Sequence, residues 1–497
     1  MLPDRQAPGK KAGLSYWANR VLEECDKASR YFAADPVHDL RVAIRRCRSM
    51  ADGFLSVDPD PQWKEMKRLG KPLFSSLGEL RDTQVMAEWI AKLSEPGDLL
   101  REKLLVTLAG KESELKAAAQ KALESFDRKR WAALNAHLAK RTDRVPLEGP
   151  VFQHLALERW MEAHQRHRQA MRNRSQVGYH QLRIGIKRFR YTVENFLPER
   201  HEKWSGDLRD LQDALGEVHD FDVLRLTVRA QSHDHPEERA HWLKRILEER
   251  QKRLDLYRGK MLGKHSLWLV WRSELPTGPA LEQAAMEKLR SWASFLDPDC
   301  THSAHVGKIA LQLYDALAQD SPLVSAPEYR RLLQAAAILH EVGRSKDGNG
   351  HQKRSYRMIS RLQPPLGWSE EEMRCVAVAA RYHQGPLPQT SDSYFVGLSA
   401  KRRSGLLPII AILRLANAMD FEHDQSIARV SLERQNGAMT LYASGLQEIS
   451  PSAERIARAR YLLETVLRTP IIVRPLPAKR AASSRATGTR RRAAGAS

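Results

Sequence analysis

The sequence predicts an all-α protein made of two helical domains. An eleven-residue signature that begins at His38 returns at His180, and a second signature, Leu-Gly-Glu-x-x-Asp, follows each copy. Two signatures that recur in the same order and at nearly the same offset indicate a duplicated helical unit. Apolar residues also recur with helical spacing over residues 12–265 and again over residues 281–470.

Breaks that contain proline or glycine divide the first region into successive helices. They lie at residues 58–61, 95–97, 146–150, 197–198 and around 236. Residues 263–280 are typical of a linker between domains, and Trp268 and Trp271 within it are expected to pack on a neighbouring surface. Residues 430–442 permit a short hairpin. Residues 476–497 are rich in Ala, Ser, Gly and Arg and predict a disordered basic tail.

Each copy of the first signature separates a cationic face from an apolar face when it is placed on a helix. At about 100° per residue, each set of charged positions falls within an arc of about 80°. The first set is His38, Arg41, Arg45 and Arg48, and the second is His180, Arg183, Lys187 and Arg190. The corresponding apolar sets are Leu40, Ile44, Cys47 and Ala51, and Leu182, Ile186, Phe189 and Val193.

A row of like charges costs a few tenths of a kcal/mol per pair unless an anion lies against it. On one helix such a row is usually a solvated face. Here both copies keep the cations at the same offsets, while the apolar positions change between Cys47 and Phe189. Solubility alone does not require this, so the pattern favours an anion-binding role.

The two signatures, His-x-x-Arg-x-x-x-Arg/Lys-Arg-x-Arg and Leu-Gly-Glu-x-x-Asp, resemble those of the CHAD family, the conserved histidine α-helical domain. The resemblance covers about residues 12–265. It implies a pair of helical bundles related by internal duplication that binds inorganic polyphosphate through basic helices. The positions that match the motif are His38, Arg41, Arg45, Arg46, Arg48, His180, Arg183, Lys187, Arg188 and Arg190.

The formal net charge of +21 indicates an acidic partner, whether polyphosphate, nucleic acid or an anionic membrane surface. Nucleic acid is the less favoured partner, because the basic rows contain no interleaved aromatic residues and no groove-reading motif. The N-terminus lacks an apolar secretion signal, and the longest apolar run, residues 406–419, is interrupted by Arg414. These features predict a cytoplasmic protein, and the resemblance to the CHAD family implies a location at polyphosphate granules. The oligomeric state stays open.

The second region carries histidines and carboxylates at the ends of several predicted helices. Imidazole nitrogens and carboxylate oxygens are the ligands that a divalent metal needs. Such a metal lowers the pKa of bound water and polarises a phosphoryl oxygen. A single histidine in this setting is more often a capping or surface residue, so the spacing alone does not identify a metal site.

The order of these residues is similar to that of HD-superfamily domains. The segments are His302-x-x-x-Val306, Ala-Ala-x-Leu-His340-Glu341-x-Gly343-Arg344, Gly350-His351 leading to Ser355, Arg381-Tyr382-His383, and Leu415-Ala416-x-Ala418-x-Asp420. They most resemble the helical C-terminal region of exopolyphosphatase/guanosine pentaphosphate phosphatase proteins. The resemblance implies a divalent metal, Mn²⁺ or Mg²⁺, on His302, His340, Glu341 and Asp420. It also implies phosphate contacts from His351, Arg354 and His383.

Two departures from that family leave the function of the second domain open. The family has His-Asp where this sequence has His340-Glu341, which places the carboxylate one methylene further out, and Arg354 stands where the relatives usually have His. The actin-like domains that carry catalysis in those relatives do not occur in this sequence. The sequence therefore predicts an inorganic polyphosphate-binding protein. The alternative is a metal-dependent HD phosphohydrolase that acts on polyphosphate or guanosine polyphosphates.

Overall fold

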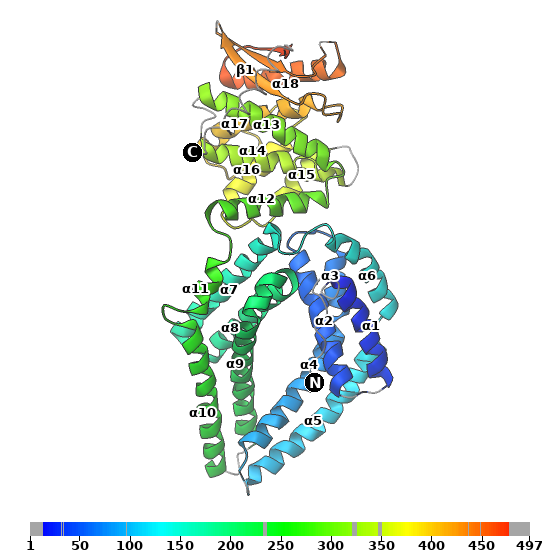
Figure 1. Cartoon of the computed structure of the whole chain (residues 1–497), viewed down its shortest axis with the longest axis vertical. Helices are drawn as coiled ribbons and strands as arrows, with labels where there is room; N and C mark the ends of the chain where they lie inside the picture. The colour runs from blue at the N-terminus through cyan, green and yellow to red at the C-terminus, as the bar shows by residue number, and fades with distance from the viewer. Residues whose placement is uncertain are drawn as a thin grey trace, which may run out of the picture. The chain divides into compact units, whose positions relative to one another are not determined.

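A computed structural model of the chain describes residues 13–476, except 31, 33, 96, 232–235, 321–325, 346–349, 436 and 448. The chain divides into two compact units, and the boundary between them in the sequence falls between Ala284 and Ala285. Nearly every element is a helix, and one small sheet belongs to the second unit (Figure 1). The predicted all-α fold class is therefore confirmed.

The first unit is entirely helical in its described residues. Its helices are α1 (Leu14–Arg30), α2 (Ala34–Phe54), α3 (Gln62–Leu69), α4 (Lys71–Leu93), α5 (Leu99–Glu124), α6 (Arg128–Thr142), α7 (Pro150–Asn173), α8 (Gln176–Phe196), α9 (Pro198–Gln231), α10 (Pro236–Met261) and α11 (Leu267–Ser273). Each of the five predicted breaks lies between two of these helices or at a helix start. The five helix breaks predicted from proline and glycine are therefore confirmed.

The two copies of the first signature form α2 and α8, which pack against each other. Helices α1–α6, drawn in blue to cyan, form one bundle, and α7–α11, drawn in teal to green, form the other (Figure 1). The predicted apolar faces of α2 and α8 are completely buried. The long helices α4, α5, α9 and α10 share a separate apolar core, which includes Ile90, Leu104, Phe221 and Trp242. The two repeats therefore contact each other through α2 and α8 and again through this second core.

The predicted linker is partly wrong, because residues 267–273 form helix α11 within the first unit. Trp268 and Trp271 are buried, which confirms that they pack on a neighbouring surface. The ring of Trp271 lies 5.3 Å from that of Phe189, and the ring of Trp268 lies 5.8 Å from that of Trp160. These aromatic contacts fix α11 against the second repeat.

The second unit is a helical domain with a three-stranded sheet. Its elements are α12 (Gly278–Ser294), α13 (Cys300–Asp320), α14 (Pro327–Leu339), η1 (Val342–Ser345), α15 (His351–Ile359), α16 (Glu370–Arg381), η2 (Ser393–Phe395), α17 (Ala400–Met419), β1 (Val430–Gln435), β2 (Ala438–Ala443), α18 (Pro451–Leu467) and β3 (Ile471–Pro475). Strands β1 and β2 confirm the predicted hairpin. Strand β3, which pairs in parallel with β2, was not expected.

The predicted basic tail, residues 476–497, lies outside the described residues from position 477 onward. Within the described ranges, none of the helices combines the length and apolar character that crossing a lipid bilayer requires.

Candidate functional site

The two signature helices are locked together by side chains that cross between the repeats. Arg46 on α2 pairs with Glu194 on α8 and donates a hydrogen bond to Asn195 Oδ1 at 3.0 Å. Asn195 Nδ2 in turn donates to Ser49 Oγ at 3.0 Å. A Cβ atom at Gly53 would overlap the ring of Phe196, so this glycine permits the close approach. The predicted phosphate-binding residue Arg46 therefore joins the repeats.

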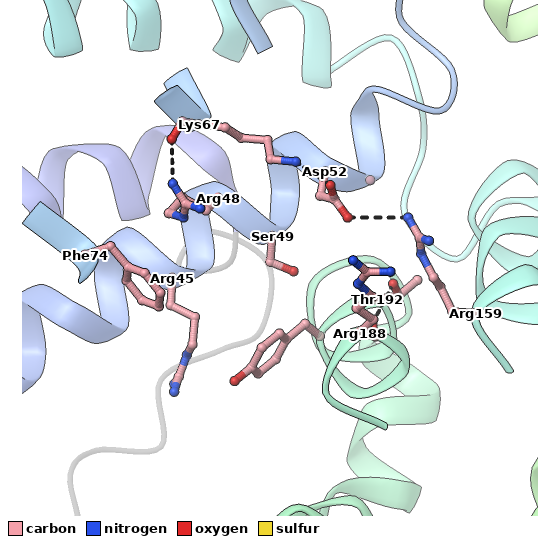
Figure 2. Close-up of a pocket in the computed structure, with 11 residues that line it drawn as sticks. Arg45, Arg48, Ser49, Asp52, Lys67, Phe74, Arg159, Arg188 and Thr192 are labelled. Atoms are coloured by element: carbon pink, nitrogen blue, oxygen red, sulfur yellow. Dashed lines mark hydrogen bonds and ion pairs between the residues drawn. The ribbon is translucent and has the colours of Figure 1, made fainter. Parts of the chain in front are cut away.

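A cavity of about 230 Å³ lies between the repeats. Figure 2 shows Arg45, Arg48 and Asp52 from α2 facing Arg188 and Thr192 from α8 across it. The full lining is Arg45, Arg48, Ser49, Asp52, Gly53, Lys67, Phe74, Arg159, Arg188, Tyr191 and Thr192. The guanidinium of Arg45 lies 5.3 Å from the centre of the Tyr191 ring in the other repeat. We call this space and the cations around it the cationic cavity.

Several other predicted residues, among them His38, His180 and Arg41, do not line this cavity. His38 is exposed, whereas His180 lies beside His219 with 4.9 Å between the centres of the two tilted rings. Arg41 lies 3.9 Å from Asp82. Arg48 donates to the backbone carbonyl of Lys67.

Arg188 pairs with Glu162 at 2.9 Å, so its charge is partly met within the second repeat. The sequence did not indicate Lys67, Arg159 or Tyr191, which also line the cavity. Lys67 and Arg159 lie outside both signatures, so no local pattern marks them.

In the second unit, the histidines and Glu341 converge from four helix ends. His302 lies on α13, His340 and Glu341 follow α14, His351 begins α15, and His383 follows α16. All five side chains are buried. Two groups of three among them have ligand atoms close enough to hold a metal ion, and both groups contain Glu341. The groups are His302, His340 and Glu341, and Glu341, His351 and His383.

Glu341 is the centre of this histidine cluster. Its Oε1 lies 3.6 Å from His340 Nε2 and 3.4 Å from His383 Nε2, and its Oε2 lies 3.3 Å from His351 Nε2. Arg344 pairs with the same carboxylate. The carboxylate therefore lies within reach of three imidazoles and one guanidinium.

Gly343 fixes the turn that carries His340 and Glu341. Its backbone N–H donates to Ser355 Oγ at 3.0 Å, and this hydroxyl donates to the His340 carbonyl at 2.7 Å. A Cβ atom at position 343 would overlap the His351 carbonyl and the Ser355 backbone. The turn therefore docks directly on the start of α15.

Comparison with known families matches each unit separately. Residues 18–229 match the CHAD domain, and residues 285–445 match Ppx/GppA phosphatase, domain III. The chain contains a CHAD domain followed by a Ppx/GppA domain III. Among solved structures, the crystal structure of the CHAD domain from the plant Ricinus communis matches at 22% sequence identity with a TM-score of 0.41. That match covers 52% of this chain and 96% of the other.

The cationic rows of the CHAD domain act on each other electrostatically. Burial, together with Arg183, Arg41 and Arg45, lowers the pKa of Lys187 to about 8. Two of these arginines belong to the first repeat, whereas Lys187 belongs to the second. The rows from the two repeats therefore meet in one field of positive charge.

Several of these cations have unmet hydrogen-bonding capacity. In the part of the chain that the structure describes, no carboxylate pairs with Arg45, Arg183, Lys187 or Arg190. The Nε atoms of the three arginines and the Tyr191 hydroxyl are buried without a hydrogen-bond partner. A buried donor without a partner costs about 1–3 kcal/mol. An anion with many acceptor oxygens would satisfy these donors.

Two carboxylates near the cationic rows differ in protonation. Asp52 lines the cationic cavity, and although burial alone would raise its pKa, Lys67 and Arg159 hold that pKa below the usual range. Asp220 lies near Arg183, and burial raises its pKa to about 6 against the opposing effect of this arginine. Asp52 is thus a fixed negative charge, whereas Asp220 gains and loses its proton near neutral pH.

In domain III, the hydrogen bonds define which imidazole nitrogens carry protons. His340 Nδ1 lies 2.8 Å from the Ala337 carbonyl, and His383 Nδ1 lies 2.8 Å from the Ala380 carbonyl. Because a carbonyl only accepts, both Nδ1 atoms carry the proton. Burial lowers the pKa of His340 to about 3 and also lowers that of His383. Both rings are therefore neutral and present Nε2 lone pairs.

These lone pairs point at an ionised carboxylate. Lone pairs on two nitrogens and a carboxylate repel one another unless a cation lies among them. The donor set and its protonation state therefore fit a divalent metal ion.

Asp420 and Asn417 orient the first of the two groups. Asp420 Oδ2 lies 2.8 Å from His302 Nδ1, and Asp420 Oδ1 accepts from the Gln425 N–H at 2.9 Å. The structure thus places Asp420, a predicted ligand, as the partner that orients His302. Asn417 Oδ1 lies 3.2 Å from the Nε2 atoms of both His302 and His340.

The sequence did not indicate Asn417, although it precedes Asp420 by three residues on one helical face. His351 and His383, which were expected to contact phosphate, lie beside Glu341. Arg354 Nε donates to the Gly343 carbonyl at 2.9 Å.

Proposed function

We propose that the protein binds inorganic polyphosphate in the cationic cavity of its CHAD domain. The observation that supports this most directly is the positive field in which cations of both repeats meet, because Arg45 on the cavity wall and Arg183 both act on Lys187 and none of the three pairs with a carboxylate in the described part of the chain. The matches to a CHAD domain and to a Ppx/GppA domain III both agree with a polyphosphate-related role. A flexible chain of phosphates supplies the repeated acceptor oxygens that the buried arginine donors lack.

The test is a titration of the purified full chain with long-chain polyphosphate at several salt concentrations. The affinity should fall steeply with salt, because phosphate binding by cations releases counterions. The Arg45→Ala/Arg183→Ala variant should weaken binding by roughly 100-fold, since each charged hydrogen bond contributes about 1.5–3 kcal/mol.

The matched control is Arg101→Ala/Arg172→Ala, which removes two exposed arginines from α5 and α7 of the same unit. It loses the same formal charge and should bind almost as tightly as the original chain. Equal losses in both double variants would show that net charge alone drives binding. Competition with DNA of matched charge distinguishes polyphosphate from nucleic acid.

This ligand also implies a location at polyphosphate granules in the cytoplasm. Imaging of the tagged chain against stained polyphosphate tests that location, and the Arg45→Ala/Arg183→Ala variant should be diffuse.

A second function is favoured by the histidine cluster of domain III, namely metal-dependent phosphohydrolysis. His302, His340, Glu341, His351 and His383 would hold the metal. A bound Mn²⁺ or Mg²⁺ would lower the pKa of a water molecule and polarise a phosphoryl oxygen. The chain itself contributes the orienting contacts of Asp420 and Asn417 and the neutral Nε2 atoms.

This second function is tested by elemental analysis of the purified protein and by phosphate release with added Mn²⁺ or Mg²⁺. The His340→Ala and His383→Ala variants should lose metal and any turnover, whereas exposed His265→Ala should retain both. A protein that binds no metal and releases no phosphate from polyphosphate or guanosine polyphosphates does not have this function.

A further inference from the structure

A groove of about 240 Å³ lies on domain III at the start of α18. Its walls come from the loop that follows α17, from the turn that follows β2 and from the first residues of α18. A Cβ atom at Gly445 in the β2 turn would overlap the Ser426 carbonyl, so this glycine lets the turn close on the loop. We call this space the α18 groove.

The α18 groove is negatively charged. Its lining contains Glu422 and Asp424, both exposed, and no Lys, Arg or His among the described residues. Within the part of the chain that the structure describes, no lysine or arginine pairs with either carboxylate. Asp424 Oδ1 accepts the Ser426 N–H at 2.9 Å, which holds this side chain at the groove. The groove therefore presents two carboxylates whose charge is not neutralised by a neighbouring side chain.

Lysine or arginine side chains suit this groove better than a metal ion does. A divalent ion needs several ligand atoms around one point. Neither Glu422 nor Asp424 belongs to a group of three candidate ligands in the described ranges. Ser426 and Ser452 also line the groove, and their hydroxyls accept hydrogen bonds from ammonium or guanidinium groups. The groove therefore fits a short basic segment.

A basic segment of the same chain leaves domain III beside the groove. The N–H of Leu476, directly after β3, donates to the Ala443 carbonyl at 2.9 Å, two residues before Gly445. Lys479 and Arg480 follow Leu476 by three and four residues. Two residues of the β2 turn span at most about 7 Å, whereas four residues of extended chain span about 14 Å. Both cations can therefore reach the groove.

The rim of the groove also offers an apolar contact. Ile449 is 98% exposed and lies in the sequence between Gln447 and Ser450, which both line the groove. Residues 477 and 478, Pro and Ala, precede the two cations. Contact between these residues and Ile449 would remove apolar surface from water. The composition of the segment therefore matches both the charge and the rim of the groove.

We propose that the α18 groove binds the first part of the chain's own segment 477–497, with Lys479 and Arg480 against Glu422 and Asp424. This segment carries six lysine and arginine residues and no acid, so its charge complements the groove. Salt weakens the contact, because both partners are exposed charges. The interface uses neither the cationic cavity nor the ligand atoms of the histidine cluster, so it is independent of both proposed functions.

The first experiment couples carboxylates to lysines in the full chain with a zero-length carbodiimide. The reagent activates a carboxylate, and the amine of a lysine within contact displaces it as a urea and leaves an amide bond. Mass spectrometry should find Lys479 joined to Glu422 or Asp424, with a yield roughly fivefold lower at about 500 mM than at about 20 mM salt. In a mixture of ¹⁴N- and ¹⁵N-labelled chains, the joined peptides should carry one isotope. Mixed isotopes would place the segment on a second copy, and coupling of Lys479 mainly to other carboxylates would place it elsewhere; either result overturns the proposal.

The second experiment measures tryptic cleavage after Lys479 and Arg480 in the full chain. Cleavage should be roughly threefold slower than in Glu422→Gln/Asp424→Asn, because tethering raises the effective concentration of a weakly bound segment. Asparagine at position 424 keeps the oxygen that accepts the Ser426 N–H, so the loop should retain its fold.

The matched control is Glu282→Gln/Glu370→Gln, which removes two exposed carboxylates elsewhere in the same unit. It loses the same formal charge and should be cleaved at the rate of the original chain. Equal cleavage rates in the original chain and in Glu422→Gln/Asp424→Asn, or equal acceleration in both double variants, overturn the proposal.

Discussion

Lys187 differs from the other cations of the CHAD domain because it can lose its charge near physiological pH. Its pKa of about 8 results from burial and from the arginines around it. We expect polyphosphate affinity to fall as the pH rises through about 8, because the neutral amine no longer attracts phosphate. The loss should reach roughly tenfold between about pH 7 and about pH 9.5, the value of one charged contact. Titrations across this range measure it.

The control for Lys187 is Lys187→Arg, because arginine stays charged throughout this range. Its affinity should be nearly constant above pH 7. A variant that still loses affinity in parallel with the original chain would assign the pH dependence to another group.

Asp220 also makes polyphosphate affinity fall with rising pH, but at a lower pH than Lys187 does. Its pKa of about 6 means that it is ionised at neutral pH and repels a polyanion, and that it becomes neutral as the pH falls below 6. Asp220→Asn should therefore bind polyphosphate roughly threefold more tightly at about pH 7.5, and the advantage should vanish near about pH 5. Isothermal titration at the two pH values measures this difference. Asp210→Asn, an exposed change on the same helix, should show no such convergence.

At the scale of secondary-structure elements, the close packing of η1 on α15 places His340 and Glu341 opposite His351. Gly343→Ala should push this turn away from α15, because a Cβ atom there overlaps backbone. We expect a loss of about 1–3 kcal/mol in the free energy of unfolding, together with loss of bound metal. Thermal unfolding and elemental analysis measure the two effects.

Gly307→Ala is the matched control for this element, since its Cβ would meet only the Ala337 Cβ at an ordinary 3.5 Å. Alanine within α13 should leave stability unchanged or raise it by up to about 1 kcal/mol. If Gly307→Ala also lost metal, the loss in Gly343→Ala could not be assigned to the turn at Gly343.

The sequence predicted the elements well where the signal was local. Helical breaks follow from prolines, and the buried and charged faces of α2 and α8 follow from spacing alone. The features that the sequence did not predict depend on contacts between segments that lie far apart in the chain. The parallel pairing of β3 with β2, the Arg46 link to Glu194, and the place of Lys67 in the cavity leave no periodic trace in the chain. Asn417 was overlooked because an uncharged amide carries no metal-ligand signature.

At the scale of the whole molecule, the two compact units, for which we propose different ligands, should unfold in two separable steps. A ligand that binds only the folded state stabilises it by about 2.7 kcal/mol at a hundredfold excess over Kd. Calorimetry should show polyphosphate raising the unfolding temperature of one transition and Mn²⁺ raising that of the other. In the Arg45→Ala/Arg183→Ala variant only the Mn²⁺ shift should remain. A single transition that both ligands move would show that the units unfold together.

The packing of the equivalent helices α2 and α8 around one cavity has an evolutionary consequence. A half-length ancestor, with one bundle and one such helix, could have built this cavity only by self-association of two identical chains. Fusion of the two copies then removed the need for a dimer and freed each half to diverge. Arg46 and Glu194, which now meet across the junction, keep a trace of that symmetry, because the corresponding positions of the other repeat are Arg188 and Asp52 and each helix still carries both charges.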